Sequence, residues 1–135
     1  MAKIQLLVMM TLDGSIIDQY TKDIPSAKIC SPIISEIIKD ADYELTQEYP
    51  ISYLLDDSSN EKFVIEATKN SLSYINAILK MGLVSVITIF VLPVLKGDTD
   101  FRKMQYSSFL STKWRLVSNT ICHDGVVCLE YLCKD

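Results

Sequence analysis

A chain of 135 residues that is 49% hydrophobic can bury a substantial core, so the sequence predicts one folded domain over residues 1–135. Its 13 basic and 17 acidic residues give a net charge of −4 with no block of lysine and arginine, which argues against a nucleic-acid partner. The longest apolar run, Leu83–Leu95, is shorter than the roughly 20 residues of a membrane-spanning helix. No secretory signal is recognisable, so we expect a cytoplasmic protein without a membrane partner.

The first strand and the first helix are both marked by local signals. Lys3–Met10 is apolar enough to lie centrally in a sheet, and Asp13-Gly14 supplies a turn after it. Ser31-Pro32 places a capping residue before a proline, which predicts that a helix begins there. Isoleucines at helical spacing after this proline would face the core.

Two short extended segments are expected next. Tyr43–Tyr49 alternates large and polar side chains, which is typical of a strand that is exposed on one face or lies at an edge. Ile51–Leu55 follows Pro50 and is predicted to be a second short extended piece, before a polar loop over Asp56–Asn60.

The following residues predict a strand–helix–strand unit. Phe63–Ile65 is short and apolar, as in a strand that is covered on both faces. Apolar residues then recur at helical spacing up to Gly82, which supplies the helix stop. Leu83–Leu95 is rich in valine and isoleucine and predicts a second buried strand. Such a unit forms a right-handed parallel crossover, and its turn over Glu66–Ser71 is where α/β proteins usually bind phosphate.

The C-terminal residues predict a β-hairpin. Trp114–Cys122 and Val126–Cys133 are β-rich runs joined through His123-Asp124-Gly125, and Asp-Gly is a strong hairpin signal. The segment between Gly97 and Trp114 is predicted to be a loop with a short helical turn. His123 is the only histidine and is expected to be a turn residue. The chain has four cysteines but no C-x-x-C pair, so these cysteines and the single histidine do not form a standard zinc-binding set.

Three separated stretches together resemble one protein family. They are IQLLVMMTLDGSIID, FVIEATKNSLSYINAILKMGLVSVITIFVLPVLKGDTDF and WRLVSNTICHDGVVCLEYL. Their order and their LDG-x-I, P-V-L-x-G and DGVV motifs are similar to the dihydrofolate reductase-like superfamily, and most of all to the reductase domain of the bacterial riboflavin-biosynthesis protein. The resemblance implies an α/β, three-layer dihydrofolate reductase-like fold with a mixed central sheet and a C-terminal β-hairpin, shortened in the middle.

The resemblance also implies a site. The end of the first strand and the following loop would face the nicotinamide and the substrate, and the substrate-binding residues implied are Met10, Thr11, Asp13, Gly14 and Ile16. The turn after the later strand would approach the NADPH phosphates, and the cofactor-binding residues implied are Glu66, Ala67, Thr68, Asn70, Ser71 and Gly97. The family carries a glycine pair in this turn where this chain has Ala67 and Thr68, which puts NADPH binding in doubt. Asn70 and Ser71 are also ordinary helix-capping residues.

Two functions remain open from the sequence. The first is an NADPH-dependent reductase of a pterin- or pyrimidine-type substrate, in which the cofactor carries the chemistry. The second is a degenerate, non-catalytic family member that binds a small ligand or a protein partner, which the absent glycine pair and the shortened middle favour. A homodimer is expected, because the reductase domains that the chain resembles pair and the β-rich tail leaves edges to cover.

Overall fold

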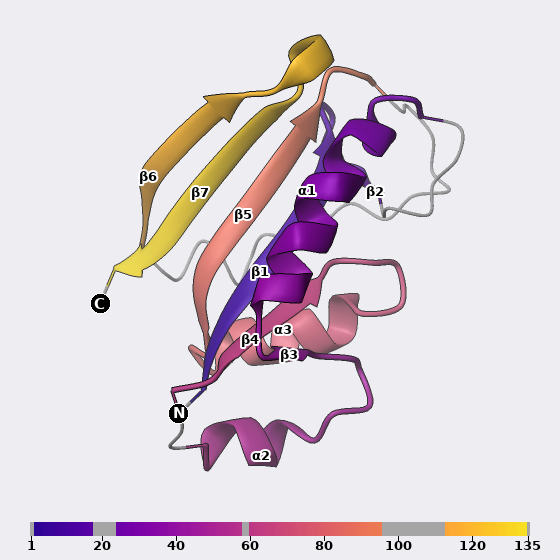
Figure 1. The fold of residues 1–135 in the computed structure, drawn as a ribbon. Helices are drawn as coiled ribbons and strands as arrows, with labels where there is room; N and C mark the ends of the chain where they lie inside the picture. The colour runs from indigo at the N-terminus through magenta and orange to yellow at the C-terminus, as the bar shows by residue number, and fades with distance from the viewer. Residues whose placement is uncertain (1, 18–23, 58–59, 96–112, 135) are drawn as a thin grey trace.

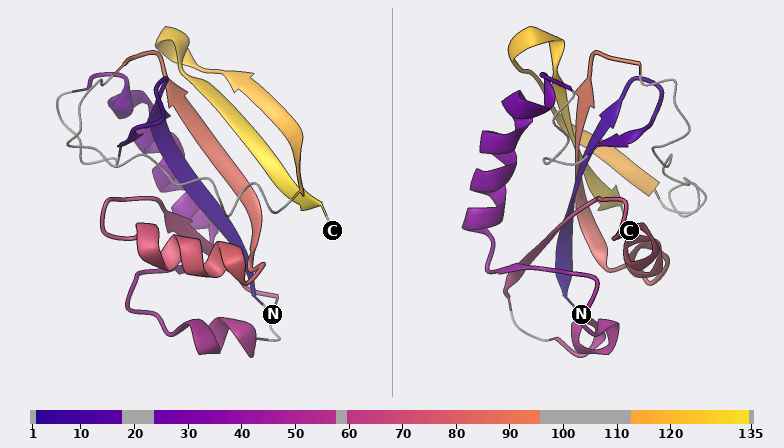
Figure 2. Two further views of the ribbon diagram at one scale, coloured as in Figure 1. Left: turned by 180° about the vertical axis from the view of Figure 1, so that it is seen from behind. Right: turned by 90° about the vertical axis from the view of Figure 1, so that its right-hand side faces the viewer.

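The computed structural model describes residues 2–17, 24–57, 60–95 and 113–134, which form a three-layer α/β fold (Figure 1). Its seven-stranded sheet has the order β3-β4-β1-β5-β7-β6, with β2 paired to β1. Helix α1 lies on one face and α3 on the other (Figure 2). The elements are β1 (Lys3–Thr11), β2 (Ile16–Ile17), α1 (Ala27–Asp40), β3 (Tyr43–Glu44), α2 (Ile51–Leu55), β4 (Lys62–Glu66), α3 (Leu72–Lys80), β5 (Val84–Leu92), β6 (Lys113–Ile121), the 3-10 turn η1 (His123–Gly125) and β7 (Val127–Lys134).

Strand β1 forms the centre of the sheet because it is apolar on both faces. It pairs in parallel with β4 on one side and with β5 on the other. Its apolar side chains alternate between the α3 side and the α1 side, and all except half-buried Met10 are buried. The two sets are Ile4, Leu6 and Val8 on the α3 side, and Leu7 and Met9 on the α1 side. The central position predicted for this strand is confirmed.

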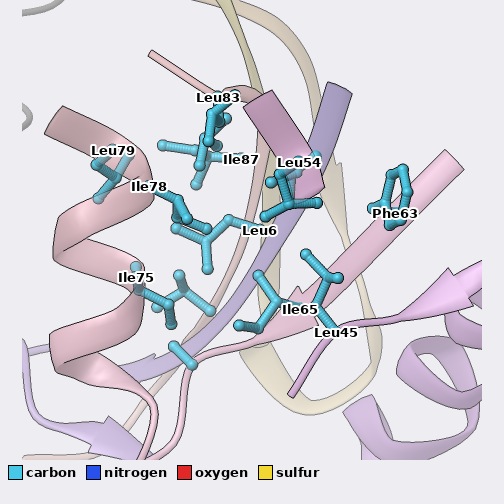
Figure 3. Packing of buried hydrophobic residues seen from close by; sticks show 14 of the residues in the cluster. Leu6, Leu45, Leu54, Phe63, Ile65, Ile75, Ile78, Leu79, Leu83 and Ile87 are labelled. Atoms are coloured by element: carbon cyan, nitrogen blue, oxygen red, sulfur yellow. The ribbon is translucent and has the colours of Figure 1, made fainter. Parts of the chain in front are cut away.

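The predicted strand–helix–strand unit is confirmed as β4, α3 and β5. The two strands are parallel with β1 between them, and α3 crosses one face of the sheet. Ile75 and Ile78 of α3 pack on Leu6 of β1 and Ile65 of β4 in the buried cluster (Figure 3). Gly82 follows the helix with φ of 70°, a left-handed conformation that glycine adopts without strain, so it ends the helix as predicted.

The C-terminal hairpin is also confirmed. Strands β6 and β7 pair in an antiparallel register. Asp124 and Gly125 take positive φ values of 56° and 80° in the connection, and exposed His123 is the turn residue that the sequence predicts. The register shifts between Leu116 and Ser118, which leaves one extra residue on β6 as a bulge. The predicted loop between Gly97 and Trp114 lies outside the described residues except at its last two positions, which open β6.

The predicted start of the first helix is wrong. Helix α1 begins at Ala27 and therefore contains Pro32 in its second turn, where proline removes one helical hydrogen bond. Ile24 to Ser26 already turn the chain, since the N–H of Ala27 donates to the Ile24 carbonyl at 3.1 Å. Burial of Ala27 and Cys30 against the sheet then outweighs the lost bond.

The segment between α1 and β4 also differs from the expectation. Only Tyr43 and Glu44 form a strand within the predicted Tyr43–Tyr49 run, and Ile51–Leu55 is the helix α2 rather than an extended piece. Apolar residues at positions 51, 54 and 55 have helical spacing, and in the helix the side chain of Leu54 is fully buried. The middle of the chain is nevertheless short, as predicted. No helix of the described residues is long and apolar enough to cross a membrane.

Burial gives the thiol of Cys30 a measurable effect on stability. Burial raises its pKa to about 12, and the nearby thiols of Cys122 and Cys128 add to the rise. The folded protein keeps this thiol protonated, whereas the unfolded chain ionises it above its ordinary pKa of 9.0. The contribution of Cys30 to the free energy of unfolding is therefore fully present below about pH 9. It should fall by about 1.4 kcal/mol per pH unit as the pH rises toward 12.

Urea unfolding at about pH 8 and about pH 11 measures this loss. A Cys30→Ala variant is the control, because it keeps every other titrating group. The wild type should lose more stability than the variant over this interval. An equal loss in both proteins would show that Cys30 has no such role.

Candidate functional site

The two groups of predicted site residues lie at the carboxyl ends of neighbouring parallel strands. The substrate group spans the end of β1 and the turn into β2, and the cofactor group other than Gly97 spans the end of β4 and the turn after it. Glu66 pairs with Leu7, four residues before Thr11, so the ends of the two strands lie about 13 Å apart along the sheet. The structure therefore places both groups at the end of the sheet where β1 and β4 have their carboxyl ends. The extra length of β1 separates the two groups.

The turn after β1 is closed by its own hydrogen bonds. The Thr11 hydroxyl donates to the Asp13 carboxylate and accepts the Ser15 N–H at 3.1 Å. The N–H of Gly14 donates to the Thr11 carbonyl at 3.0 Å. Thr11 is buried, so its side chain positions half-exposed Asp13 instead of meeting a ligand itself.

The other two predicted substrate residues differ in their access to a ligand. Ile16 is buried and pairs with half-buried Met10 between β2 and β1. Ser15, which the sequence did not single out, has a buried hydroxyl with no hydrogen-bond partner among the described residues. Of the predicted substrate group, Met10, Asp13 and Gly14 keep accessible surface that a ligand could meet.

The turn after β4 uses its backbone donors internally. The N–H of Ala67 donates to the Leu7 carbonyl at 2.8 Å, and Ala67 is fully buried in the core on the α3 side. The N–H of Thr68 donates to the Ser71 hydroxyl at 2.9 Å. That hydroxyl also donates to the Glu66 carbonyl at 3.1 Å, inside the protein. Both N–H groups at the position of the absent glycine pair are therefore already bonded.

Ser71 does not cap α3 in the way its position suggests. It is the N-terminal boundary residue of the helix, but its side chain makes no capping hydrogen bond to the first turn. The hydroxyl instead points back into the turn. There it accepts the Thr68 N–H and donates to the Glu66 carbonyl, so it provides hydrogen-bond partners for two backbone groups of the turn. Asn70 is exposed beside it, and Gly97 lies outside the described residues.

A cavity of about 310 Å³ opens beside this turn. We call it the Glu66 cavity, and its walls come from β4, the turn between β4 and α3, and β3 with the connection from β3 to α2. Its lining includes the carboxylates Glu44, Glu48 and Glu66 and the apolar residues Leu45 and Ile65. The parallel pairing of Glu44 with Val64 brings the connection to this place.

The residues at this turn do not fit the phosphates of NADPH. A phosphate at a strand-to-helix turn is held by free backbone N–H groups, and those of Ala67 and Thr68 are occupied. The three carboxylates of the Glu66 cavity would also repel a pyrophosphate. The Cβ of Ala67 is not the obstacle, because it packs into the core. The turn differs from a dinucleotide-binding turn because its N–H groups at Ala67 and Thr68 are already bonded and carboxylates lie nearby. The side chain of Ala67 is not the reason.

Comparisons with known proteins agree on the fold. No family model matches the sequence, and no curated protein matches it. RibD of Acinetobacter baumannii matches with a TM-score of 0.60 and 17% identity over the whole chain, which spans only 59% of RibD. A pyrimidine reductase-like protein from Corynebacterium diphtheriae has a TM-score of 0.64 and 9% identity, covering 99% of this chain and 92% of its own.

Dihydrofolate reductase from Enterococcus faecalis, solved in complex with NADP(H) and RAB-propyl, has a TM-score of 0.59 at 11% identity, covering 98% of this chain and 96% of its own. At such low identities the agreement concerns the fold. The mixed sheet, the helix layers and the C-terminal hairpin all match the expectation from the sequence motifs. The chain has the dihydrofolate reductase-like fold that riboflavin-biosynthesis and pyrimidine reductase-like proteins share.

Proposed function

We propose that this protein is a ligand-binding member of its fold that does not carry out NADPH-dependent reduction. The observation that carries the proposal is the occupancy of the Ala67 and Thr68 N–H groups by Leu7 and Ser71. Neither N–H group can bind a phosphate without first breaking its hydrogen bond within the protein. The fold is retained, but the backbone N–H groups of Ala67 and Thr68 form hydrogen bonds within the protein.

The Glu66 cavity suggests the class of ligand. Its volume of about 310 Å³ lies near the lower end of small-molecule pockets. Buried Leu45 and Ile65 form the apolar part of its wall, and the carboxylates around it can accept hydrogen bonds from amino groups. A small nitrogen heterocycle that carries exocyclic amines, such as an aminopyrimidine, satisfies both features. The four free thiols support the cytoplasmic location expected from the sequence.

The second candidate is an NADPH-dependent reductase of a pterin- or pyrimidine-type substrate. Half-exposed Asp13, which Thr11 holds at the end of β1, favours it. The Enterococcus relative was solved with NADP(H), which also supports this candidate. The two candidates differ in whether NADPH binds, so a binding measurement separates them.

Thermal-shift titrations with 2,4-diaminopyrimidine and with NADPH provide the test. The diaminopyrimidine should stabilise the protein in a saturable way, by about 2.7 kcal/mol at one hundred times its dissociation constant. NADPH should give no saturable shift up to millimolar concentration. Glu66→Gln should weaken the diaminopyrimidine shift, whereas Glu36→Gln on the exposed side of α1 should leave it unchanged. A saturating NADPH shift at micromolar concentration would establish the reductase instead.

Restoring the glycine pair tests the physical reason. The Ala67→Gly/Thr68→Gly variant keeps both backbone N–H groups bonded to the Leu7 carbonyl and the Ser71 hydroxyl. We therefore expect that the variant, like the wild type, gives no NADPH-dependent shift in melting temperature. Tight NADPH binding by the variant would show that the two side chains, and not the hydrogen bonds, exclude the cofactor.

A further inference from the structure

A second cavity, of about 440 Å³, lies beside the C-terminal end of α1. Its walls come from that end of the helix, from the amino ends of β1, β4 and β5, and from the middle of β7. It shares no lining residue with the Glu66 cavity, which opens at the carboxyl end of β4. We call it the Gln5 cavity, and its lining includes Lys3, Gln5, Asp40, Lys62, Val86 and Glu130.

The Gln5 cavity lies where the core on the α1 side ends. On β1, Leu7 and Met9 face α1 and are buried. Alternate residues of a strand share a face, so Gln5 and Lys3 lie on the same side, but Gln5 is half-buried and Lys3 is exposed. The Gln5 amide donates to the buried hydroxyl of Thr88 on β5 at 2.9 Å. Polar side chains therefore replace the apolar core at this end of the sheet.

Two lysines lie together on the β4 side of the cavity. Lys3 of β1 and Lys62 of β4 are direct neighbours in the parallel register, so their strands hold them about 4.8 Å apart on one face. Neither side chain forms an ion pair with any residue that the structure describes. Like charges at neighbouring positions of a sheet repel each other. An anionic group between the two ammonium groups would offset this repulsion.

Carboxylates lie on the other walls of the cavity. Glu130 belongs to β7, which is separated from β1 by β5, so two strand spacings, about 10 Å, separate the two strands. Glu130 is half-buried and has no ion-pair partner in the described part of the chain. Asp40 ends α1, where the helix dipole also favours a cation. The β7 and helix walls therefore attract a cationic group, whereas the lysines attract an anionic one.

We propose that the Gln5 cavity binds a small zwitterion that carries an apolar group, such as an amino acid with an apolar side chain. The ligand ammonium bonds to Glu130, and the long stems of Lys3 and Lys62 let their charges reach the ligand carboxylate. Half-buried Ile37 and Val86 contact the apolar group. A simple anion would be repelled by the carboxylates and a simple cation by the lysines, so a ligand with both charges fits best.

Calorimetric titrations with three related compounds test the proposal. L-Phenylalanine carries both charges, whereas 3-phenylpropanoate lacks the ammonium and 2-phenylethylamine lacks the carboxylate. Phenylalanine should bind in a saturable way, and its volume is well within a cavity of about 440 Å³. Each of the other two compounds should bind about tenfold more weakly or less, because each loses a charge-assisted hydrogen bond.

Two variants assign the two ends of the ligand. Glu130→Gln and Lys3→Gln should each weaken phenylalanine binding by about tenfold. Only Lys3→Gln should also weaken binding of 3-phenylpropanoate, which has no ammonium for Glu130 to bind. The matched controls are Lys28→Gln at the exposed start of α1 and Asp124→Asn in the exposed hairpin turn, where asparagine tolerates the positive φ. Both should leave the affinity unchanged.

Urea unfolding of each variant shows that it remains folded, and Lys3→Gln should not lower stability because it removes a repulsion. Equal affinities for phenylalanine and 3-phenylpropanoate would overturn the proposal, since the cavity would then be a simple anion site. The absence of saturable phenylalanine binding up to millimolar concentration would overturn it as well. Neither result bears on NADPH or diaminopyrimidine binding, since the two cavities share no lining residue.

Discussion

Replacing Phe90 with alanine is expected to lower the free energy of unfolding by about 3–5 kcal/mol. Phe90 lies on β5, is 0% exposed, and pairs across the sheet with Met9 of β1 in the core on the α1 side. The substitution removes the ring and leaves a cavity between the sheet and α1, which the surrounding strands cannot close. Urea unfolding followed by circular dichroism measures the change.

The matched control is Met81→Ala. Met81 is 47% exposed just after α3, so its truncation should change the free energy of unfolding by less than about 0.5 kcal/mol. Comparable losses for the two variants would contradict the assignment of Phe90 to the core. The contrast also tests the position of α1 over the sheet, because α1 supplies one wall of the Phe90 environment.

Replacing Ser71 with alanine is expected to cost about 2 kcal/mol of unfolding free energy. The hydroxyl accepts the Thr68 N–H and donates to the Glu66 carbonyl, and Ser71 is only 7% exposed. Alanine leaves the Thr68 N–H and the Glu66 carbonyl without these partners, and the bond between the Ser71 hydroxyl and the Glu66 carbonyl is buried. Removal of one partner from a buried hydrogen bond costs more than the bond itself contributes.

Ser73→Ala is the control for this prediction, because Ser73 is an exposed serine in the first turn of the same helix. Its stability should stay within about 0.5 kcal/mol of the wild type. If Ser71→Ala were no more costly than Ser73→Ala, water would be replacing the hydroxyl. The N–H groups of the turn would then be accessible to a phosphate after all.

The elements that the sequence predicts correctly are those whose local pattern agrees with their burial. β1, β4 and β5 are apolar runs buried on both faces, and their pairing is parallel as such runs require. Gly82 and Asp124-Gly125 adopt the positive φ values that make them helix stop and hairpin turn. At these positions local propensity and tertiary packing favour the same conformation, so the pattern alone is sufficient.

The errors arise where packing decides between two local options. Ser31-Pro32 is a good helix start in isolation, yet burial of Ala27 extends α1 one turn earlier. Ile51–Leu55 is short enough to be read as strand or helix, and burial of Leu54 beneath β1 selects the helix. Propensity could not distinguish these cases, because the deciding contacts lie far away in the sequence.

The candidate site shows the same limit. The motifs correctly place Asp13 and Glu66–Ser71 at the ends of neighbouring strands. The carboxylates Glu44 and Glu48 reach the Glu66 cavity only through the pairing of β3 with β4, for which no local signal exists. The direction of the Ser71 hydroxyl is likewise a tertiary outcome, since a serine at that position commonly caps the helix.

The proposal that this protein does not bind NADPH therefore depends on the turn between β4 and α3. In a dinucleotide-binding turn the backbone N–H groups face the ligand. Here they complete the structure of the turn itself, with the Leu7 carbonyl and the Ser71 hydroxyl as acceptors.

An NMR titration with NADPH that follows the backbone amide resonances of Ala67 and Thr68 tests this claim most directly. Because both N–H groups are already hydrogen-bonded within the protein, their chemical shifts should not change in a saturable way up to millimolar NADPH. Saturable shifts of these two amides at micromolar NADPH would contradict the account, since they would show that the turn opens and accepts the cofactor phosphates.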